Sequence, residues 1–228
     1  MKDNQKVGVV IAAAGSSQRM LGVDKIFADL DGEPVLAHTV TVFETCGDVD
    51  QIVIVLAKHN MERGQKLASE SGWSKVVAVC EGGERRQDSV VKGLECLKDC
   101  QWVLIHDGAR PLVTAEIIER GLEAAEEAGA AIAAVPVVDT IKVAGENMMV
   151  QGTPPRQSLW SVQTPQVFRF DIINDAYHQL RFEVTDDSTA VERLGHKVKI
   201  YQGSYDNIKI TSPDDLVIAG LLWRKYGH

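Results

Sequence analysis

Val7-Gly8-Val9-Val10-Ile11-Ala12 is a continuous apolar run, and Ala13-Ala14-Gly15-Ser16-Ser17-Gln18-Arg19 follows it directly. Strands of a parallel sheet are buried on both faces and have this unbroken apolar composition. The small residues that follow allow a ligand to approach the backbone closely, and they expose N–H groups to phosphate. Together the two stretches predict a parallel sheet whose first loop binds a phosphate-bearing ligand. The alternative for the loop is a tight strand–helix turn with a surface arginine.

The alternation of strand and helix patterns continues along most of the chain. Further strands are expected at Gln51–Leu56, Val76–Cys80, Trp102–His106, Ala131–Pro136, Val198–Gln202 and Asn207–Ile210. Helices are expected to begin at Pro34, Asn60, Asp88 (as N-cap), Thr114, Phe170, Thr185 and Ser212, with Gly129 ending the fourth. This order predicts an α/β fold with a doubly wound, mostly parallel sheet and right-handed crossovers.

Residues 139–162 interrupt the alternation. They hold two short strand-like pieces, Thr140–Val143 and Ser158–Val162, among Gly145, Gly152 and the pair Pro154-Pro155. We interpret this segment as a β-arm that projects from a single domain formed by residues 1–228. A long surface loop is the alternative, although such loops are uncommon in compact domains.

Composition narrows the class of protein. The chain has 228 residues, 45% of them hydrophobic and 25% charged, with a formal net charge of -8. An acidic chain is not typical of general nucleic-acid binders, whereas a small anionic ligand responds only to its local cluster of charges. No apolar run is long enough for a membrane span, no signal sequence is evident, and the four cysteines have no zinc-ligand spacing. We therefore expect a cytoplasmic protein with free thiols and with no nucleic-acid or membrane partner.

Arg19 and Lys25 suit a triphosphate, because arginine can bind two oxygens as a fork and lysine supplies a compact charge. The common phosphate motifs G-x-x-x-x-G-K-[ST] and G-x-G-x-x-G are both absent, which argues against a P-loop NTPase and against the usual dinucleotide fold. A second glycine-containing link, Glu81–Ser89, joins a strand to a helix and can hold a ribose or a base edge.

His106-Asp107-Gly108-Ala109-Arg110-Pro111 lies at the end of a predicted strand. Sheets of this type place ligand-contacting groups at the carboxyl ends of their strands. One carboxylate plus triphosphate oxygens is a normal way to hold Mg²⁺, so Asp107 is the candidate metal ligand. Asp107 could instead cap the next turn, and His106 is interpreted as structural. No Ser-His-Asp or Cys-His arrangement is present, and a substrate that brings its own phosphate needs no protein nucleophile.

In this order the motifs resemble those of the 2-C-methyl-D-erythritol 4-phosphate cytidylyltransferase family, from about Val7 to about Ala219. The resemblance rests on Ala-Ala-Ala-Gly-x-x-x-Arg-Met at Ala12–Met20, Lys25, His106–Pro111, Asp139-Thr140-Ile141-Lys142, Gln163-Thr164-Pro165-Gln166, Thr185-Asp186-Asp187 and Asp206-Asn207-Ile208-Lys209. Two positions depart from the family pattern. Ser17 stands where the family often has Gly, and Asp24 precedes Lys25 where many members have Pro.

The resemblance implies a Rossmann-like nucleotidyltransferase that uses CTP and Mg²⁺ (or Mn²⁺) and forms a homodimer through the arm. Residues that would hold CTP are Ala12, Ala13, Ala14, Gly15, Gly83, Glu84, Ser89 and Gly108. Catalytic groups would be Arg19 and Lys25 at the α-phosphorus, with Lys209 and the arm residue Arg156. Asp107, Arg110, Thr164 and Thr185 would line the second substrate's site, and Thr140 and Arg156 would reach the partner's site.

The residues alone indicate nucleotidyl transfer to an anion, whereas cytidine and the sugar come from the resemblance. A cytidylyltransferase for another polyol phosphate, such as ribitol 5-phosphate, is the nearest alternative. A non-catalytic nucleotide-binding regulator is the alternative of another class. The joint presence of Arg19, Lys25, Asp107 and Lys209 argues against a regulator.

Overall fold

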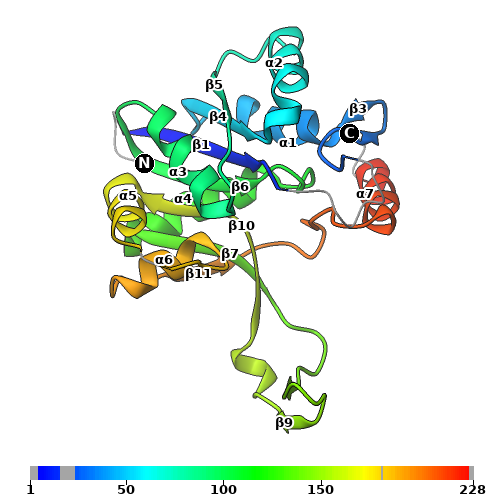
Figure 1. The fold of residues 1–228 in the computed structure, drawn as a ribbon, viewed down its shortest axis with the longest axis vertical. Helices are drawn as coiled ribbons and strands as arrows, with labels where there is room; N and C mark the ends of the chain where they lie inside the picture. The colour runs from blue at the N-terminus through cyan, green and yellow to red at the C-terminus, as the bar shows by residue number, and fades with distance from the viewer. Residues whose placement is uncertain (1–4, 16–23, 181, 226–228) are drawn as a thin grey trace.

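The computed structural model describes residues 5–15, 24–180 and 182–225. A seven-stranded sheet with the order β11-β7-β10-β6-β1-β4-β5 forms the centre of the molecule (Figure 1). Every neighbouring pair in it is parallel except those of β10, which runs antiparallel to both β6 and β7. The strands are β1 (Lys6–Ala13), β4 (Gln51–Leu56), β5 (Val76–Glu81), β6 (Cys100–Asp107), β7 (Ala130–Pro136), β10 (Trp160–Arg169) and β11 (Lys199–Gln202).

Helices cover both faces of the sheet, which explains why β1 and β4 have no polar face. Val9 and Ile11 of β1 pack into one apolar cluster with α1 (Val35–Thr45) and α4 (Ala115–Ala128). Val10 points the other way, into a second cluster with α3 (Arg86–Cys96), α5 (Phe170–Gln179) and α6 (Asp187–Arg193). The doubly wound α/β fold predicted from the sequence is therefore confirmed.

Smaller elements complete the first face. The helices α2 (Met61–Glu70) and α7 (Pro213–Lys225) add partly buried apolar side chains to its margin, and the 3₁₀ turn η2 (Lys58–Asn60) precedes α2. A two-stranded hairpin, β2 (Asp29–Leu30) and β3 (Glu33–Pro34), leads into α1. No helix among the described residues is long and apolar enough to cross a membrane.

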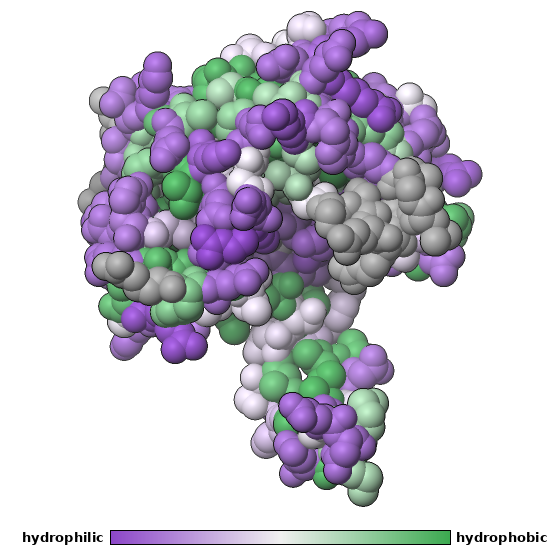
Figure 2. All heavy atoms as spheres, in the orientation of Figure 1, coloured by the Kyte–Doolittle hydropathy of each residue, from purple (hydrophilic) through white to green (hydrophobic). Residues whose placement is uncertain are grey.

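The predicted β-arm is present between β7 and β10, and it projects well away from the sheet (Figure 1). It contains the paired strands β8 (Val143–Ala144) and β9 (Val150–Gly152) and the 3₁₀ turn η3 (Arg156–Ser158). Figure 2 shows green, hydrophobic atoms on its surface, where Val138, Met148 and Met149 are each at least 65% exposed. A large apolar area thus faces solvent in the single chain.

Several sequence predictions are wrong in detail. The piece Ser158–Val162 is not confined to the arm, because β10 continues to Arg169 and inserts between β6 and β7. Of Thr140–Val143, only Val143 is paired. Asn207–Ile210 is not a strand: it is a loop held by the bond from the Ile210 N–H to the Ala109 carbonyl, 2.8 Å. Asp88 is not an N-cap, because Arg85 caps α3 and Asp88 accepts the Arg85 backbone N–H at 3.1 Å from the third helical position.

Candidate active site

Two pockets lie side by side at the carboxyl ends of the parallel strands, where α/β sheets usually bind ligands. The first, here the loop pocket, has a volume of about 250 Å³ and is lined by the loop after β1 and the glycine link before α3. The second, here the threonine pocket, has a volume of about 510 Å³ and includes Thr164, Thr185 and Thr189. Arg86, Asp107 and Lys209 line both pockets, so these three side chains form the wall that the pockets share.

Close backbone packing builds the loop pocket. The Gly82 N–H donates to the Leu56 carbonyl at 2.8 Å, and the Gly83 N–H donates to Ser89 Oγ at 3.0 Å. A Cβ on Gly82 would lie only 2.4 Å from Cβ of Ala14. Glycine is therefore required where the link between β5 and α3 touches the loop that follows β1.

Asp107 is the electrostatic centre of the shared wall. Its Oδ2 lies 2.9 Å from Lys209 Nζ and 3.3 Å from Arg110 Nε, and its Oδ1 lies 3.7 Å from Arg86 Nε. Burial acts to raise the pKa of Asp107, but Lys209, Arg86 and Arg110 together hold it well below its ordinary value. The carboxylate is thus charged at neutral pH and is surrounded by three cations.

A buried network fixes the backbone on which Asp107 sits. The Asp107 N–H donates to Thr164 Oγ1 at 3.0 Å, and that hydroxyl is 3.1 Å from Nδ1 of His106. Burial lowers the pKa of His106 to about 3, so the ring is neutral at physiological pH. The prediction that His106 is structural agrees with this environment, because the ring lies behind the pockets with 0% exposure.

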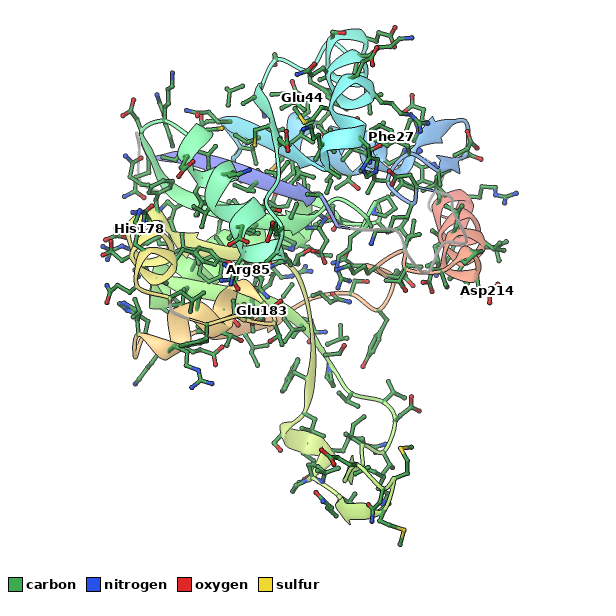
Figure 3. All side chains as sticks on the ribbon, viewed as in Figure 1. Phe27, Glu44, Arg85, His178, Glu183 and Asp214 are labelled. Atoms are coloured by element: carbon green, nitrogen blue, oxygen red, sulfur yellow. The ribbon has the colours of Figure 1, made fainter. Side chains whose placement is uncertain are left out.

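Sequence reasoning missed Arg86. Its Nη2 lies 2.6 Å from Oδ2 of Asp187, a fully buried carboxylate that also accepts the Tyr177 hydroxyl. Burial acts to lower the pKa of Arg86, but Asp187 and Asp107 keep it above its ordinary value. The sequence feature that could have indicated this ion pair is Arg85-Arg86 at the start of one helix together with Asp186-Asp187 at the start of another. Figure 3 places Arg85 near Glu183, where these two helix starts face each other.

Most residues predicted for the site come together in these pockets. Ala12, Ala13, Ala14, Gly15, Lys25, Gly83, Glu84 and Ser89 line the loop pocket. Arg110, Thr164 and Thr185 line the threonine pocket, and Asp107 and Lys209 line both. Gly108 does not line either pocket, because its N–H donates to the Ala12 carbonyl at 3.0 Å. The neighbouring Ala109 lines the loop pocket instead. Arg19 and Ser17 lie outside the described residues.

Thr140 and Arg156 lie on the exposed arm and line neither pocket of their own chain. Arg156 Nη1 donates to the Val138 carbonyl at 2.8 Å, a bond within the arm. The predicted role of both residues therefore depends on a second chain.

The described residues contain no group of three or more His, Cys, Asp or Glu side chains that could hold a metal ion by themselves. A magnesium ion in this site would need ligand oxygens in addition to the Asp107 carboxylate. Oxygens of a bound triphosphate would meet that need, because Mg²⁺ is commonly held by one or two carboxylates plus substrate phosphates. The residues present therefore fit a metal that arrives with a nucleotide.

A family model described as 2-C-methyl-D-erythritol 4-phosphate cytidylyltransferase matches residues 7–225. Among curated proteins, one of that name from Dehalococcoides mccartyi is 54% identical over 97% of this chain and 98% of its own length. Another of that name, from Alkaliphilus oremlandii, is 48% identical over 96% of this chain and 95% of its own length.

Solved structures agree with the sequence matches. 4-Diphosphocytidyl-2C-methyl-D-erythritol synthase from Anaerococcus prevotii superposes with a TM-score of 0.86 at 30% identity, covering 96% of both chains. 2-C-methyl-D-erythritol 4-phosphate cytidylyltransferase from Thermus thermophilus superposes with a TM-score of 0.78 at 32% identity, covering 96% of this chain and 100% of the other. In both superpositions the similarity covers 96% of this chain.

Proposed function

Because this chain belongs to the 2-C-methyl-D-erythritol 4-phosphate cytidylyltransferase family, we propose that it transfers CMP from CTP to 2-C-methyl-D-erythritol 4-phosphate in isoprenoid precursor synthesis. The products are CDP-methylerythritol, in which a diphosphate joins cytidine to the polyol, and inorganic pyrophosphate. The observation that carries this assignment is the pair of pockets divided by one charged wall. One pocket has the small-residue loops suited to a nucleotide, and the other has cations and hydroxyls suited to a polyol phosphate.

In this proposal an oxygen of the substrate phosphate attacks the α-phosphorus of CTP in line. A P–O bond forms at the α-phosphorus, the bond to the β-phosphate oxygen breaks, and that electron pair leaves with pyrophosphate. Lys25 in the loop pocket and Lys209 in the shared wall would stabilise the charge that develops on the phosphoryl oxygens. Arg19 is proposed as the partner of Lys25. The protein contributes positioning and electrostatics, with no covalent intermediate.

We propose that the reaction uses Mg²⁺ or Mn²⁺, with Asp107 and the triphosphate as ligands. When bound, the ion would neutralise triphosphate charge and favour departure of pyrophosphate. Lys209 Nζ lies 2.9 Å from the Asp107 carboxylate, and this cation helps to keep Asp107 negatively charged in the shared wall.

The identity of the polyol phosphate is testable by pyrophosphate release with CTP against a panel. We expect 2-C-methyl-D-erythritol 4-phosphate to give a kcat/KM above that of ribitol 5-phosphate by about 10²-fold or more, because buried polar groups placed for one polyol are left unpaired by another. A higher kcat/KM for ribitol 5-phosphate would reassign the substrate. Absence of pyrophosphate with every phosphate tested would favour a non-catalytic regulator.

We further propose a homodimer in which the arm of one chain completes the site of the other. The exposed apolar residues of the arm would be covered by a partner, and a two-fold pair is the simplest arrangement that covers them. Thr140 and Arg156 would then reach the partner's threonine pocket, where the forked guanidinium suits a phosphate monoester.

Mixed dimers test this arrangement. Arg156→Ala and Lys25→Ala chains should each have almost no activity alone at a sugar-phosphate concentration near the wild-type KM. At higher concentrations, Arg156→Ala should show a KM for the sugar phosphate that is raised far more than its KM for CTP. Mixing the two chains should restore activity, because one site in each hybrid then has an intact Lys25 and the partner's intact Arg156. Hybrid dimers that form without any return of activity would contradict a role across the interface.

The proposal also places the enzyme in the cytoplasm with small molecules as its ligands and no nucleic-acid partner. All four cysteines are free thiols, which fits a reducing compartment. The net charge of -8 fits a protein whose cations are concentrated in a small-molecule site.

A further inference from the structure

The wall between the two pockets is where the reacting atoms must meet. An in-line attack joins a phosphate in the threonine pocket to a phosphorus in the loop pocket, so a side chain that lines both pockets can touch both groups. Only Arg86, Asp107 and Lys209 do so among the described residues. Asp107 and Lys209 already have assigned roles, and Arg86 has none.

The hydrogen-bond donors of Arg86 are mostly unused. Nη2 donates to Asp187, whereas Nε is 3.7 Å from Asp107 Oδ1, beyond hydrogen-bond distance, and Nη1 bonds no described residue. In the described part of the chain, Asn207 Oδ1 is the only fully buried side-chain polar atom without a partner. The unpaired Nη1 is therefore not sealed in the core but remains accessible from the pockets.

The guanidinium is also held firmly. Asp187 is fully buried, and it is fixed on its other oxygen by the Tyr177 hydroxyl. Asp187 begins α6, whereas Arg86 begins α3, so the ion pair links two elements on the same face of the sheet. A cation with fixed orientation and free donors costs little reorganisation when a phosphate enters.

We propose that Arg86 is a further catalytic residue, whose Nη1 and Nε groups bind phosphoryl oxygens at the junction of the attacking phosphate and the α-phosphate of CTP. This inference rests on the proposed function. Arginine suits the position because its planar fork can contact two phosphate groups, whereas lysine offers a single point charge. Asp187 and Tyr177 are positioning residues for this guanidinium.

A purely structural role for Arg86 predicts a different result in one double variant. Arg86→Gln alone leaves the buried Asp187 carboxylate unpaired and is expected to lower Tm. Arg86→Gln/Asp187→Asn removes both charges and restores a neutral pair. If Arg86 only ties α3 to α6, activity returns together with Tm in the double variant.

We expect Tm to recover in the double variant while kcat stays about 10²–10³-fold below wild type, the usual loss for one donor to a transition-state oxyanion. KM for CTP should change much less than kcat. A matched control is Arg169→Gln/Asp171→Asn, which removes an exposed arginine–aspartate pair at the opposite end of β10 and should leave kcat unchanged. A kcat within about tenfold of wild type in Arg86→Gln/Asp187→Asn overturns the proposal, and a larger loss supports it.

If the double variant does not fold, Arg86→Lys distinguishes a catalytic role of Arg86 from a structural one. It retains the charge beside Asp187 but loses the fork, so a kcat loss above about tenfold at wild-type Tm is expected, and a smaller loss overturns the proposal. The activity of the wild-type enzyme distinguishes a failure of this inference from a failure of the proposed function. If the wild-type protein releases no pyrophosphate from CTP and the polyol phosphate, both the proposed function and the role of Arg86 are wrong. If the wild type is active and the double variant is equally active, only the role of Arg86 is wrong.

Discussion

Gly82 is the position where a single methyl group should damage nucleotide binding most specifically. A Cβ there would lie 2.4 Å from Ala14 Cβ and 2.7 Å from Ser89 Oγ, whereas ordinary van der Waals contact begins at about 3.4 Å. The backbone of Gly82 is also tied to Leu56 by its N–H and to Lys92 Nζ by its carbonyl, at 2.8 and 2.9 Å. Gly82→Ala therefore cannot be accommodated by movement of the glycine link alone.

The two loops of the loop pocket must separate by about 1 Å to admit the methyl group. Overpacking of this kind costs about 1–3 kcal/mol of stability. For a chain of this size each kcal/mol lowers Tm by about 2–4 °C. Displacement of binding groups by about 1 Å can reduce catalysis by roughly 10²-fold, so the functional loss should exceed what the change in Tm alone would cause.

Calorimetric titration of CTP and thermal unfolding of the same variants provide the assay. We expect Gly82→Ala to weaken CTP binding by more than about tenfold at a temperature where the protein is fully folded. Gly47→Ala is the matched control, because its Cβ would meet nothing within 4 Å and should leave both CTP affinity and Tm unchanged. A Gly82→Ala protein that binds CTP with wild-type affinity would refute the view that this contact shapes the nucleotide site.

Three further substitutions test separate parts of the site. Lys25→Ala should reduce kcat by about 10²–10³-fold in protein that stays folded, and near-normal kcat would remove its electrophilic role. Asp107→Asn should raise the Mg²⁺ concentration needed for half-maximal activity, whereas turnover that persists in EDTA would exclude a metal requirement. Asp186 caps α6 by accepting the Thr189 N–H at 3.1 Å, so Asp186→Ala should cost about 1–2 kcal/mol in chemical unfolding and Asp186→Asn less. Burial acts to raise the pKa of Asp186, but its hydrogen bonds lower it overall, so this stabilisation should be complete above about pH 4 and lost as the pH falls below it.

The sequence predicted most of the residues that line the loop pocket, because this pocket depends on local patterns. The apolar run at Val7–Ala12 predicted a strand that is buried on both faces. Because ligands bind at the carboxyl ends of the strands in such sheets, the loop after this strand and Asp107 were both expected at the ligand site. Both features are readable within a few residues. Their juxtaposition in one pocket then follows from the strand order β6-β1-β4-β5.

The threonine pocket was predicted less completely, because the part of β10 that lines it is polar. Gln163, Thr164 and Gln166 are buried in β10, yet the sequence pattern there does not distinguish a central strand from an arm. Their partners come from remote segments: Gln163 Nε2 donates to the Ser204 carbonyl at 2.7 Å, and Gln166 Nε2 donates to Asp186 at 2.9 Å. A pattern-based prediction has no access to such pairings, since it assigns polar residues to exposed positions.

Arg86 illustrates the same limit for a charged group. In the sequence it stands next to Arg85 in an ordinary strand–glycine–helix link, and the two are indistinguishable by type. In the structure Arg85 pairs with Asp88 three residues away, whereas Arg86 pairs with Asp187 101 residues away. Only the tertiary contacts of the two arginines therefore distinguish Arg85, which caps a helix at the surface, from Arg86, which lies in the shared wall.

Nucleotidyl transfer at the shared wall is tested most directly by following the oxygens of the substrate phosphate into the products. The measurement is ³¹P NMR of the products formed from CTP and 2-C-methyl-D-erythritol 4-phosphate whose phosphate carries ¹⁸O. Attack of that phosphate on the α-phosphorus predicts that all the label stays in the diphosphate product, with one labelled oxygen in the bridge, and that pyrophosphate is unlabelled. Label in pyrophosphate or in free phosphate would contradict the proposed transfer.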